Sequence, residues 1–362
     1  MTEPKPISLK RRRRRILIRV LAVLFPLVLV FTIGEVFVRY RYPIVDPRPY
    51  FLPGIYRSDP TIGWELLPNY EGHYHQQVER LVTRTNADAM RDPPLTTERK
   101  ATPRRVLFLG DSIAFGRGLG QEHTIARRLE ARWEKTAVFN AGVPGFDTSQ
   151  ELARLRRFGP VIKPQLVVLE WYRNDILSPS HQVAAKVFEG HLVDSDTTEA
   201  DYKRWRSRFV EHSHNPIDWS ALIRLGRIHW KNSKTQRKLI ERAKTPWEID
   251  GSDEGFQRSL AALREAKVWC QENGAKFAVV MFPAREECEV EAKAPVYPTV
   301  LAEFCRAEEI PFCDLTPRWK EHFKRTGQTL YLPRDRCHPN PVGGDTTAGW
   351  IDEAFADLLP PL

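Results

Sequence analysis

The sequence predicts an α/β fold in which helices cover both faces of a parallel sheet. Short apolar runs and helical patterns alternate from residue 104 onward, and this alternation is typical of a parallel sheet. The runs are largely continuous rather than alternating between apolar and polar residues, as expected for strands buried on both faces. The five runs occupy residues 106–109, 137–140, 166–171, 277–282 and 312–315.

The chain begins with a strongly basic tail. Residues 1–15 contain seven Lys or Arg residues and one acid, Glu3, and so carry six of the nine net positive charges of the 362-residue chain. The remaining residues are close to neutral, which argues against a nucleic-acid-binding surface. We therefore expect residues 1–15 to be a basic cytoplasmic tail and expect no nucleic-acid partner.

An apolar segment follows the tail over residues 16–38, interrupted only by Arg19 and Glu35 near its ends. At about 1.5 Å per residue it reaches roughly 34 Å, enough to cross the hydrocarbon core of a bilayer. No small-x-small cleavage site follows it, which favours an uncleaved transmembrane anchor over a signal peptide. The positive tail should stay in the cytoplasm, so the bulk of the protein is expected outside it, anchored by a single pass in the cell membrane.

Residues 39–103 are rich in Pro, Tyr and Arg and contain short turn-like pieces. Such a composition indicates strands and turns rather than helix. We expect a juxtamembrane strap or linker over residues 39–103, followed by the main domain over residues 104–362.

Helical patterns separate the apolar runs, over residues 124–135, 148–159, 256–274, 297–309 and 341–359. In the second of these, Thr148 is expected to be the N-cap, because Glu151 three residues later would complete a capping box. The third is expected to end at Gly274, since glycine readily adopts the left-handed conformation that closes many helices.

Residues 176–253 form an insertion much longer than an ordinary connection in such a fold. Within residues 202–244 there are twelve Lys or Arg and three acids, with Trp205, Trp219 and Trp230 interleaved. One interpretation is an inserted helical pair whose tryptophans pack on the main domain. The other is a basic amphipathic lid that contacts anionic lipid or glycan.

The five cysteines show no C-x-x-C spacing, so no zinc site or other metal site is expected. Cys288 follows the fourth apolar run and Cys337 precedes His338, which places both at the same edge of the predicted sheet. A disulfide between Cys288 and Cys337 is therefore a hypothesis for an oxidising compartment. The alternative is that Cys337 fills space under its loop.

Polar residues or glycines follow the predicted strands, and these should meet at the carboxyl edge of a parallel sheet. Ser112 follows the first strand, Gly145 the second and Asn174 the third, and Asp335 and His338 follow the last. A serine hydroxyl needs a base, which His338 can supply, and Asp335 can orient the imidazole. The backbone N–H groups of Ser112 and Gly145 and the amide of Asn174 can stabilise an oxyanion.

These blocks resemble the SGNH (GDSL-type) hydrolase superfamily. They read "LGDSIAFG", "NAGVPG", "YRND" and "DRCH", in the order and spacing of that family, and the resemblance covers residues 104–358. It implies a three-layer α/β/α sandwich with a flavodoxin-like five-stranded sheet of order 2-1-3-4-5, and no cofactor. The departure is Tyr172, which stands where the family usually has glycine and alters the space around Asn174.

The expected function is a serine esterase that works outside the cytoplasm through an acyl-serine intermediate. Its expected substrates are acyl esters of envelope glycans or lipids. Two alternatives stay open at this point, an O-acyltransferase to a cell-surface polysaccharide and a catalytically silent scaffold that binds glycans or partner proteins.

Overall fold

The structure is a computed structural model that describes residues 9–41, 54–73, 81–176, 185–213, 220–244, 251–291, 294–333 and 335–362. Its centre is a parallel sheet of five strands in the order β11-β10-β7-β5-β6. Numbered along the chain within this sheet, the order is 2-1-3-4-5, so the predicted fold class is confirmed. The strands are β5 (Arg104–Leu109), β6 (Thr136–Asn140), β7 (Leu166–Trp171), β10 (Lys276–Met281) and β11 (Phe312–Asp314).

Helices cover both faces of the sheet because side chains alternate along each strand. In β5, Leu107 and Leu109 face one apolar cluster, while Val106 and Phe108 face the other. The first cluster includes residues of α5 (Thr148–Ile162), α9 (Glu254–Glu272) and α11 (Tyr297–Ala307). The second includes residues of α4 (Ile125–Arg132), α12 (Thr316–Thr326) and α13 (Pro341–Phe355).

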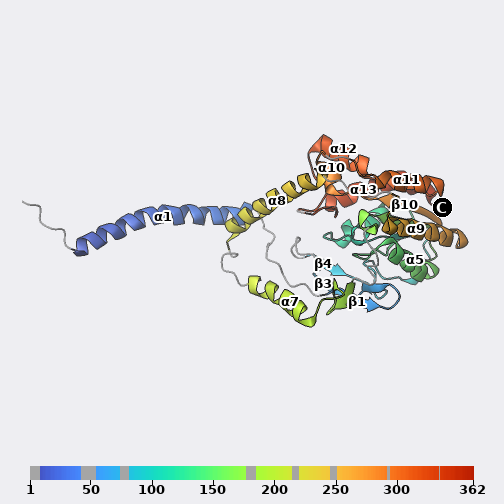
Figure 1. Ribbon diagram of the computed structural model, residues 1–362, viewed down its shortest axis with the longest axis horizontal. Helices are drawn as coiled ribbons and strands as arrows, with labels where there is room; N and C mark the ends of the chain where they lie inside the picture. Colours follow the sequence, from blue (N-terminus) through green and yellow to red (C-terminus); the bar gives the residue numbers. More distant parts are fainter. Residues whose placement is uncertain are drawn as a thin grey trace, which may run out of the picture.

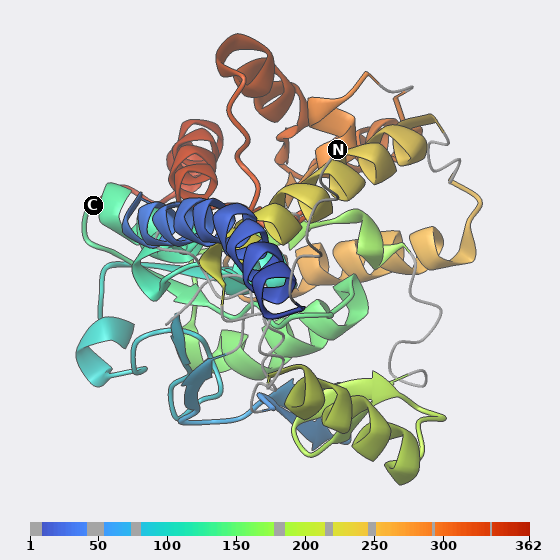
Figure 2. The same cartoon turned by 90° about the vertical axis from the view of Figure 1, so that its left-hand side faces the viewer.

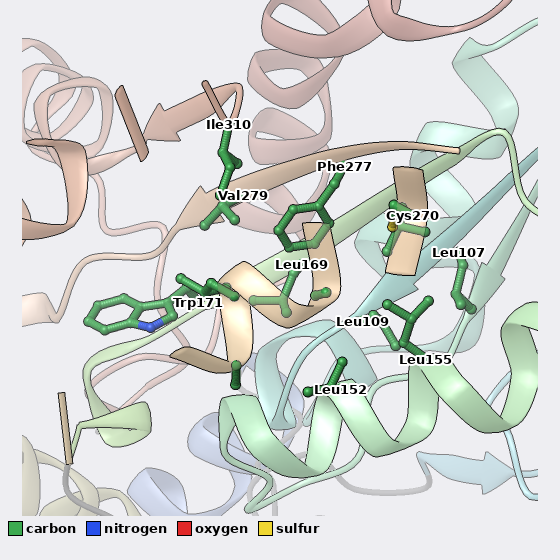
Figure 3. Close-up of a cluster of buried hydrophobic side chains, with 14 of the residues drawn as sticks. Leu107, Leu109, Leu152, Leu155, Leu169, Trp171, Cys270, Phe277, Val279 and Ile310 are labelled. Carbon is green, nitrogen blue, oxygen red and sulfur yellow. The ribbon is translucent and has the colours of Figure 1, made fainter. Parts of the chain in front are cut away.

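Figure 3 shows the first of these clusters between the sheet and helices α5 and α9. Leu152 and Leu155 of α5 lie below Leu109 and Leu169 of the strands, and Cys270 of α9 lies beside them. These side chains are buried, so the sheet is fixed from this face by apolar packing. The packing holds the strand ends, and with them the loops that follow, in one place.

The N-terminal helix α1 (Leu9–Arg41) extends away from the main domain (Figure 1). Among the described residues it alone is long and apolar enough to cross a membrane, over Arg13–Tyr40, by length and composition. Such a helix is a feature of both signal anchors and signal peptides. Of the predicted basic tail, residues 1–8 lie outside the described residues.

Two small antiparallel hairpins precede the sheet: β1 (Tyr56–Asp59) with β2 (Gly63–Leu66), and β3 (Glu71–His73) with β4 (Val82–Arg84). A short helix, α2 (Thr97–Lys100), follows. Trp64 and Leu66 of β2 pack with Phe115 and Phe146 in a third apolar cluster. The first hairpin thus lies against the loops that follow β5 and β6.

The insertion contains a hairpin that the helical prediction missed, β8 (Ala185–Phe188) with β9 (His191–Asp194). Two helices follow, α7 (Glu199–Ser213) and α8 (Ala221–Lys244). Trp230 is 58% exposed, while Trp205 is 38% exposed and contacts the rings of His191 and Tyr202 within the insertion. Trp219 lies outside the described residues.

The N-cap of α5 is Asp147 rather than the predicted Thr148. The Asp147 side chain accepts hydrogen bonds from the N–H groups of Ser149 and Gln150, and the Gln150 side-chain oxygen accepts one from the Asp147 N–H. The predicted capping box therefore exists one residue earlier, since aspartate is at least as good a cap as threonine.

Candidate active site

Ser112 lies in the turn that follows β5 and is the first residue of the short helix α3 (Ser112–Phe115). Gly110 precedes it with φ +148°, and a Cβ there would lie 2.5 Å from Glu170 Oε2. Only glycine fits this position, because it combines a rare backbone conformation with a close approach. Asp111 caps α3 through a 2.7 Å hydrogen bond from the Ile113 N–H, which turns the chain sharply at Ser112.

Three of the predicted site residues form one continuous chain of hydrogen bonds. Ser112 Oγ lies 2.8 Å from His338 Nε2, although the two residues are 226 positions apart. His338 Nδ1 lies 2.8 Å from Asp335 Oδ1. With Nδ1 protonated toward the carboxylate, Nε2 is free to accept the serine proton, which is the geometry of a serine–histidine–aspartate triad.

The loop around Asp335 keeps its carboxylate charged. Burial raises the pKa of Asp335, but the bond with His338 and the N–H groups of Cys337 and His338 outweigh it, so the pKa lies well below its usual range. The backbone N–H of Arg336 adds a third backbone donor at 2.6 Å. A carboxylate that accepts several hydrogen bonds stays ionised and fixed in orientation, as the partner of an imidazolium must be.

Gly145 lies in the loop after β6, with φ +87°. Its neighbour Gly142 fits closely under the nucleophile helix, because a Cβ there would lie 2.4 Å from Phe115 N. Within the part of the chain that the structure describes, no hydrogen bond uses the backbone N–H of Ser112 or Gly145. Both donors are thus available to an incoming oxygen.

Asn174 lies in the 3₁₀ turn η2 (Arg173–Asp175), which follows β7, and its side-chain amide already makes one hydrogen bond. Its side-chain nitrogen donates to Asp111 Oδ2 at 2.9 Å. An amide nitrogen carries two protons, so one N–H is used by Asp111 and one remains for substrate. The Asn174 amide thus keeps one N–H that the bond to Asp111 does not use.

Buried carboxyl groups under the nucleophile turn were not anticipated from the sequence. Glu170 Oε2 accepts from the N–H groups of Asp111 and Ala114, each at 3.2 Å. Burial, followed by repulsion from neighbouring carboxylates, raises the pKa values of Glu170, Glu151 and Asp175 well above their ordinary values. An acid inside an otherwise apolar strand, Glu170 within residues 166–171, was the available signal.

Glu286 joins the two loops that carry site residues. It lies in α10 (Arg285–Glu289), which follows β10, and accepts hydrogen bonds from Arg173 at 2.6 Å and from Arg336 at 2.5 Å. Arg173 precedes Asn174, and Arg336 lies between Asp335 and His338. Glu286 therefore connects the turn that carries Asn174 to the loop that carries Asp335 and His338 through largely buried ion pairs.

Tyr172, the departure from the family pattern, is buried and packs in the cluster that also contacts Cys337. The Arg173 guanidinium lies 5.7 Å from the centre of its ring. The larger side chain is therefore accommodated inside the protein.

The hypothesis of a Cys288–Cys337 disulfide is wrong, because all five cysteines are free. The Cys288 thiol lies 3.6 Å from the Tyr331 hydroxyl. The Cys337 thiol lies 3.6 Å from His338 Nδ1. Each sulfur has its own partner, and Cys337 fills space beside the imidazole.

The side chains of Asp335, Cys337 and His338 each have a potential ligand atom within 4.8 Å of the others. Such donors suit zinc. The same carboxylate oxygen and ring nitrogen form the hydrogen bond that orients His338 toward Ser112. A metal ion bound here would displace the proton that this arrangement requires, so the site is better suited to proton transfer.

Comparison with known proteins gives one family match and several distant structural neighbours. Residues 108–345 match the GDSL-like lipase/acylhydrolase family. No curated protein matches the sequence.

Three of these solved structures are matched over nearly the whole length of their own chains. A lipolytic G-D-S-L protein from Veillonella parvula is 12% identical over 70% of this chain and 98% of its own, with a TM-score of 0.41. The acetyl xylan esterase AlAXEase is 14% identical over 69% and 98%, with a TM-score of 0.42. A catalytic mutant of Axe2, an acetylxylan esterase from Geobacillus stearothermophilus, is 13% identical over 70% and 94%, with a TM-score of 0.40.

Proposed function

Because the chain belongs to the GDSL-like lipase/acylhydrolase family, whose members act on esters, we propose that it is a membrane-anchored serine esterase of the cell envelope. Its substrates in this proposal are acyl esters of envelope glycans or lipids, and Ser112 carries the acyl group during turnover. The observation that carries the proposal is the chain of two 2.8 Å contacts from Ser112 through His338 to Asp335.

In the first half of the reaction, Ser112 Oγ attacks the ester carbonyl carbon while His338 Nε2 takes its proton. The carbonyl π electrons move to oxygen, which becomes an oxyanion. His338 then returns the proton to the departing alcohol oxygen as its bond to the carbonyl carbon breaks. The products are the free alcohol and an ester on Ser112.

In the second half, His338 takes a proton from water, and the hydroxide oxygen attacks the acyl-serine carbonyl. The Ser112 Oγ leaves with the proton from His338, and the carboxylic acid is released. A sugar hydroxyl in place of water would give O-acyl transfer by the same steps. The two activities therefore differ only in the second nucleophile.

The oxyanion of each tetrahedral intermediate would be held by the N–H groups of Ser112 and Gly145 and by Asn174. Such preorganised donors usually supply the largest single part of the rate enhancement. The open N–H groups of Ser112 and Gly145 support this assignment.

Anchoring through α1, with the N-terminus in the cytoplasm, is also proposed. The apolar side chains along α1 are exposed, as a lipid-facing helix requires. The arginines before residue 16 outnumber Arg39 and Arg41 after the apolar segment, and positive charge favours the cytoplasmic side. The catalytic domain would then lie outside the cytoplasm.

A product assay on the purified full-length chain in detergent tests the proposal. The substrates are p-nitrophenyl esters of short and long acyl chains, with and without a polysaccharide acceptor. Release of free acid without acceptor supports an esterase. Acyl transfer to the acceptor as the sole product would make the protein an acyltransferase, and no turnover together with no labelling by a fluorophosphonate would make it a binding scaffold.

A further inference from the structure

Glu35, the single acid in the apolar stretch of α1, caps the first turn of α8. It is 7% exposed. Its carboxylate accepts from the N–H of Ala221 at 2.8 Å and of Leu222 at 3.0 Å, and from the Ser220 hydroxyl at 2.9 Å. Arg39 donates a further bond at 2.7 Å. A carboxylate is the favoured partner of a helix N-terminus, so Glu35 ties α8 to α1.

Gly34 allows this contact to be close. A Cβ at Gly34 would lie 2.5 Å from Leu222 Cδ1. The absence of a side chain at Gly34 thus lets the first turn of α8 pack directly on α1. Gly34 and Glu35 therefore hold α8 near the end of the apolar segment. Gly34 leaves room for Leu222, and the Glu35 carboxylate accepts hydrogen bonds from the first turn of α8.

The far part of α8 contacts α10, at the rim of the active site. Leu239 of α8 is 1% exposed. The first residue of α10, Arg285, donates its N–H to the Arg336 carbonyl at 2.8 Å, in the loop that carries His338. Helix α8 therefore connects the end of α1 to the loops of the catalytic site.

The active-site edge of the sheet faces α1. Helix α10 follows the carboxyl end of β10 and lies on the α1 side of it, and α8 continues from the end of α1 toward α10 (Figure 1). Figure 2 looks from this side, with α1 in front of the domain. The ester-cleaving edge is thus directed back toward the segment proposed to enter the membrane.

The length of α8 limits the distance between the active-site edge of the sheet and the apolar segment of α1. From Ala221 to Leu239 the helix is about 27 Å long at 1.5 Å per residue. It begins at Glu35, three residues before the end of the apolar segment, and runs obliquely to α1 (Figures 1 and 2), so it reaches at most about 22 Å beyond that end. Phospholipid ester groups lie in the interfacial layer, which adds only about 5–8 Å beyond each side of the hydrocarbon core. An active site supported at the far end of α8 lies well above that layer.

We propose that α8 is a spacer that holds the active site facing the bilayer, above the interfacial layer and at most about 22 Å beyond the end of the apolar segment, where it acts on esters of glycan chains and not on phospholipids. The inference rests on the proposed esterase function and anchor, and it narrows the glycan-or-lipid choice to glycans. Along the spacer, Trp230, Lys234, Arg237 and Lys238 lie exposed on one helical face. This face stands above the headgroups and is open to a sugar chain.

The height is measured by energy transfer from a fluorophore on the full-length protein to acceptor lipids in nanodiscs. The fluorophore is placed by Ser149→Cys, an exposed residue at the active-site edge, in a Cys337→Ser background. The measured height does not depend on turnover. A protein without esterase activity would therefore refute the proposed function, while a low label would refute the spacer. We expect a height of about 10–22 Å above the edge of the hydrocarbon core. A label within about 8 Å of that edge, which is the depth of the interfacial layer, would overturn the proposal.

Two variants test whether α8 sets this height. Deleting residues 226–236 removes about three turns while keeping the helical faces in phase, and it should lower the label by up to about 16 Å. Glu35→Ala should broaden the distribution of heights by releasing α8 from α1. Glu241→Gln, at an exposed position of the same helix, is the control and should change nothing. Unchanged heights in both test variants would contradict a spacer.

Activity on two substrates tests the glycan assignment. The nanodisc-bound wild type should deacylate an O-acetylated polysaccharide while releasing no fatty acid from phosphatidylglycerol of the same nanodisc. Phospholipid hydrolysis at a rate comparable to polysaccharide deacylation would overturn the assignment. Turnover of p-nitrophenyl acetate is measured in parallel, and its absence would refute the esterase function rather than the spacer.

Discussion

The side-chain amide of Asn174 donates a 2.9 Å hydrogen bond to Asp111, the residue immediately before Ser112. Asp111 in turn accepts from the Ile113 N–H. The same aspartate thus shapes the turn at Ser112 and orients the amide that we propose as an oxyanion donor. This arrangement fixes the amide before substrate arrives, which avoids reorganisation during the reaction.

Asn174→Ala should therefore lower kcat and leave KM nearly unchanged. Loss of one oxyanion donor costs about 2.7–4 kcal/mol of transition-state stabilisation, or 10²–10³-fold in kcat. Steady-state kinetics on p-nitrophenyl acetate measure the effect. A change confined to KM would mean that Asn174 binds the ground-state substrate instead.

Glu286→Gln should reduce kcat about 10- to 100-fold, since small displacements of catalytic groups have effects of that size. The glutamine keeps the shape but removes the charge that holds Arg173 and Arg336 together. Glu265→Gln removes a carboxylate from an exposed ion pair with Arg156 and is the matched control.

The rate at which a fluorophosphonate labels Ser112 separates misplacement from unfolding in the Glu286→Gln variant. Labelling should slow in a variant whose circular dichroism spectrum and melting curve stay cooperative. A wild-type labelling rate in folded Glu286→Gln protein would show that the ion pairs do not position the site.

Glu151→Gln should stabilise the protein at neutral pH. Burial and nearby carboxylates raise the pKa of Glu151 above its ordinary 4.5, and neither of its oxygens has a hydrogen-bond partner among the described residues. The unfolded chain ionises this group at lower pH than the folded protein does, so the free energy of unfolding falls as the pH rises above 4.5.

Glutamine at position 151 does not ionise, so Glu151→Gln should remove this pH-dependent loss of the free energy of unfolding. We expect a gain of about 1 kcal/mol near pH 7, seen as a rise in Tm of roughly 2–4 °C, and little gain near pH 4. Thermal unfolding at both pH values measures it, with Glu272→Gln at an exposed helix position as control. An equal effect at the two pH values would refute the assignment of a neutral, buried Glu151.

A reporter fused after Leu362 tests the topology. Alkaline phosphatase should be active there because it folds in an oxidising compartment, and a reporter that needs the cytoplasm should be silent. Reversed activities would place the catalytic domain in the cytoplasm and remove the basis for an envelope substrate.

The parts of the site that follow strand ends could be predicted from sequence. Ser112, Asn174 and His338 come after apolar runs, and parallel strands bring their carboxyl ends to one edge regardless of what lies between. The family resemblance implied the strand order 2-1-3-4-5, and the sheet of the structure has this order.

Contacts between side chains far apart in sequence could not be predicted. The bonds of Glu286 to Arg173 and Arg336 join three loops, and each of these charged residues is unremarkable in its own segment. The sequence shows Glu35 only as an acid near the end of the apolar segment, and its partners at Ser220–Leu222 are about 185 positions away. The hypothesis of a Cys288–Cys337 disulfide was wrong for the same reason. Two cysteines at the same edge of a sheet need not lie close enough to form a bond.

If Ser112 is the nucleophile of an esterase, Ser112→Ala should abolish the activity and leave the fold intact. Turnover of p-nitrophenyl acetate by the purified variant should fall by about 10³-fold or more, as expected for removal of a triad member. Labelling by a fluorophosphonate should disappear, while the circular dichroism spectrum stays that of the wild type. Near-normal turnover by a folded Ser112→Ala protein would contradict the account.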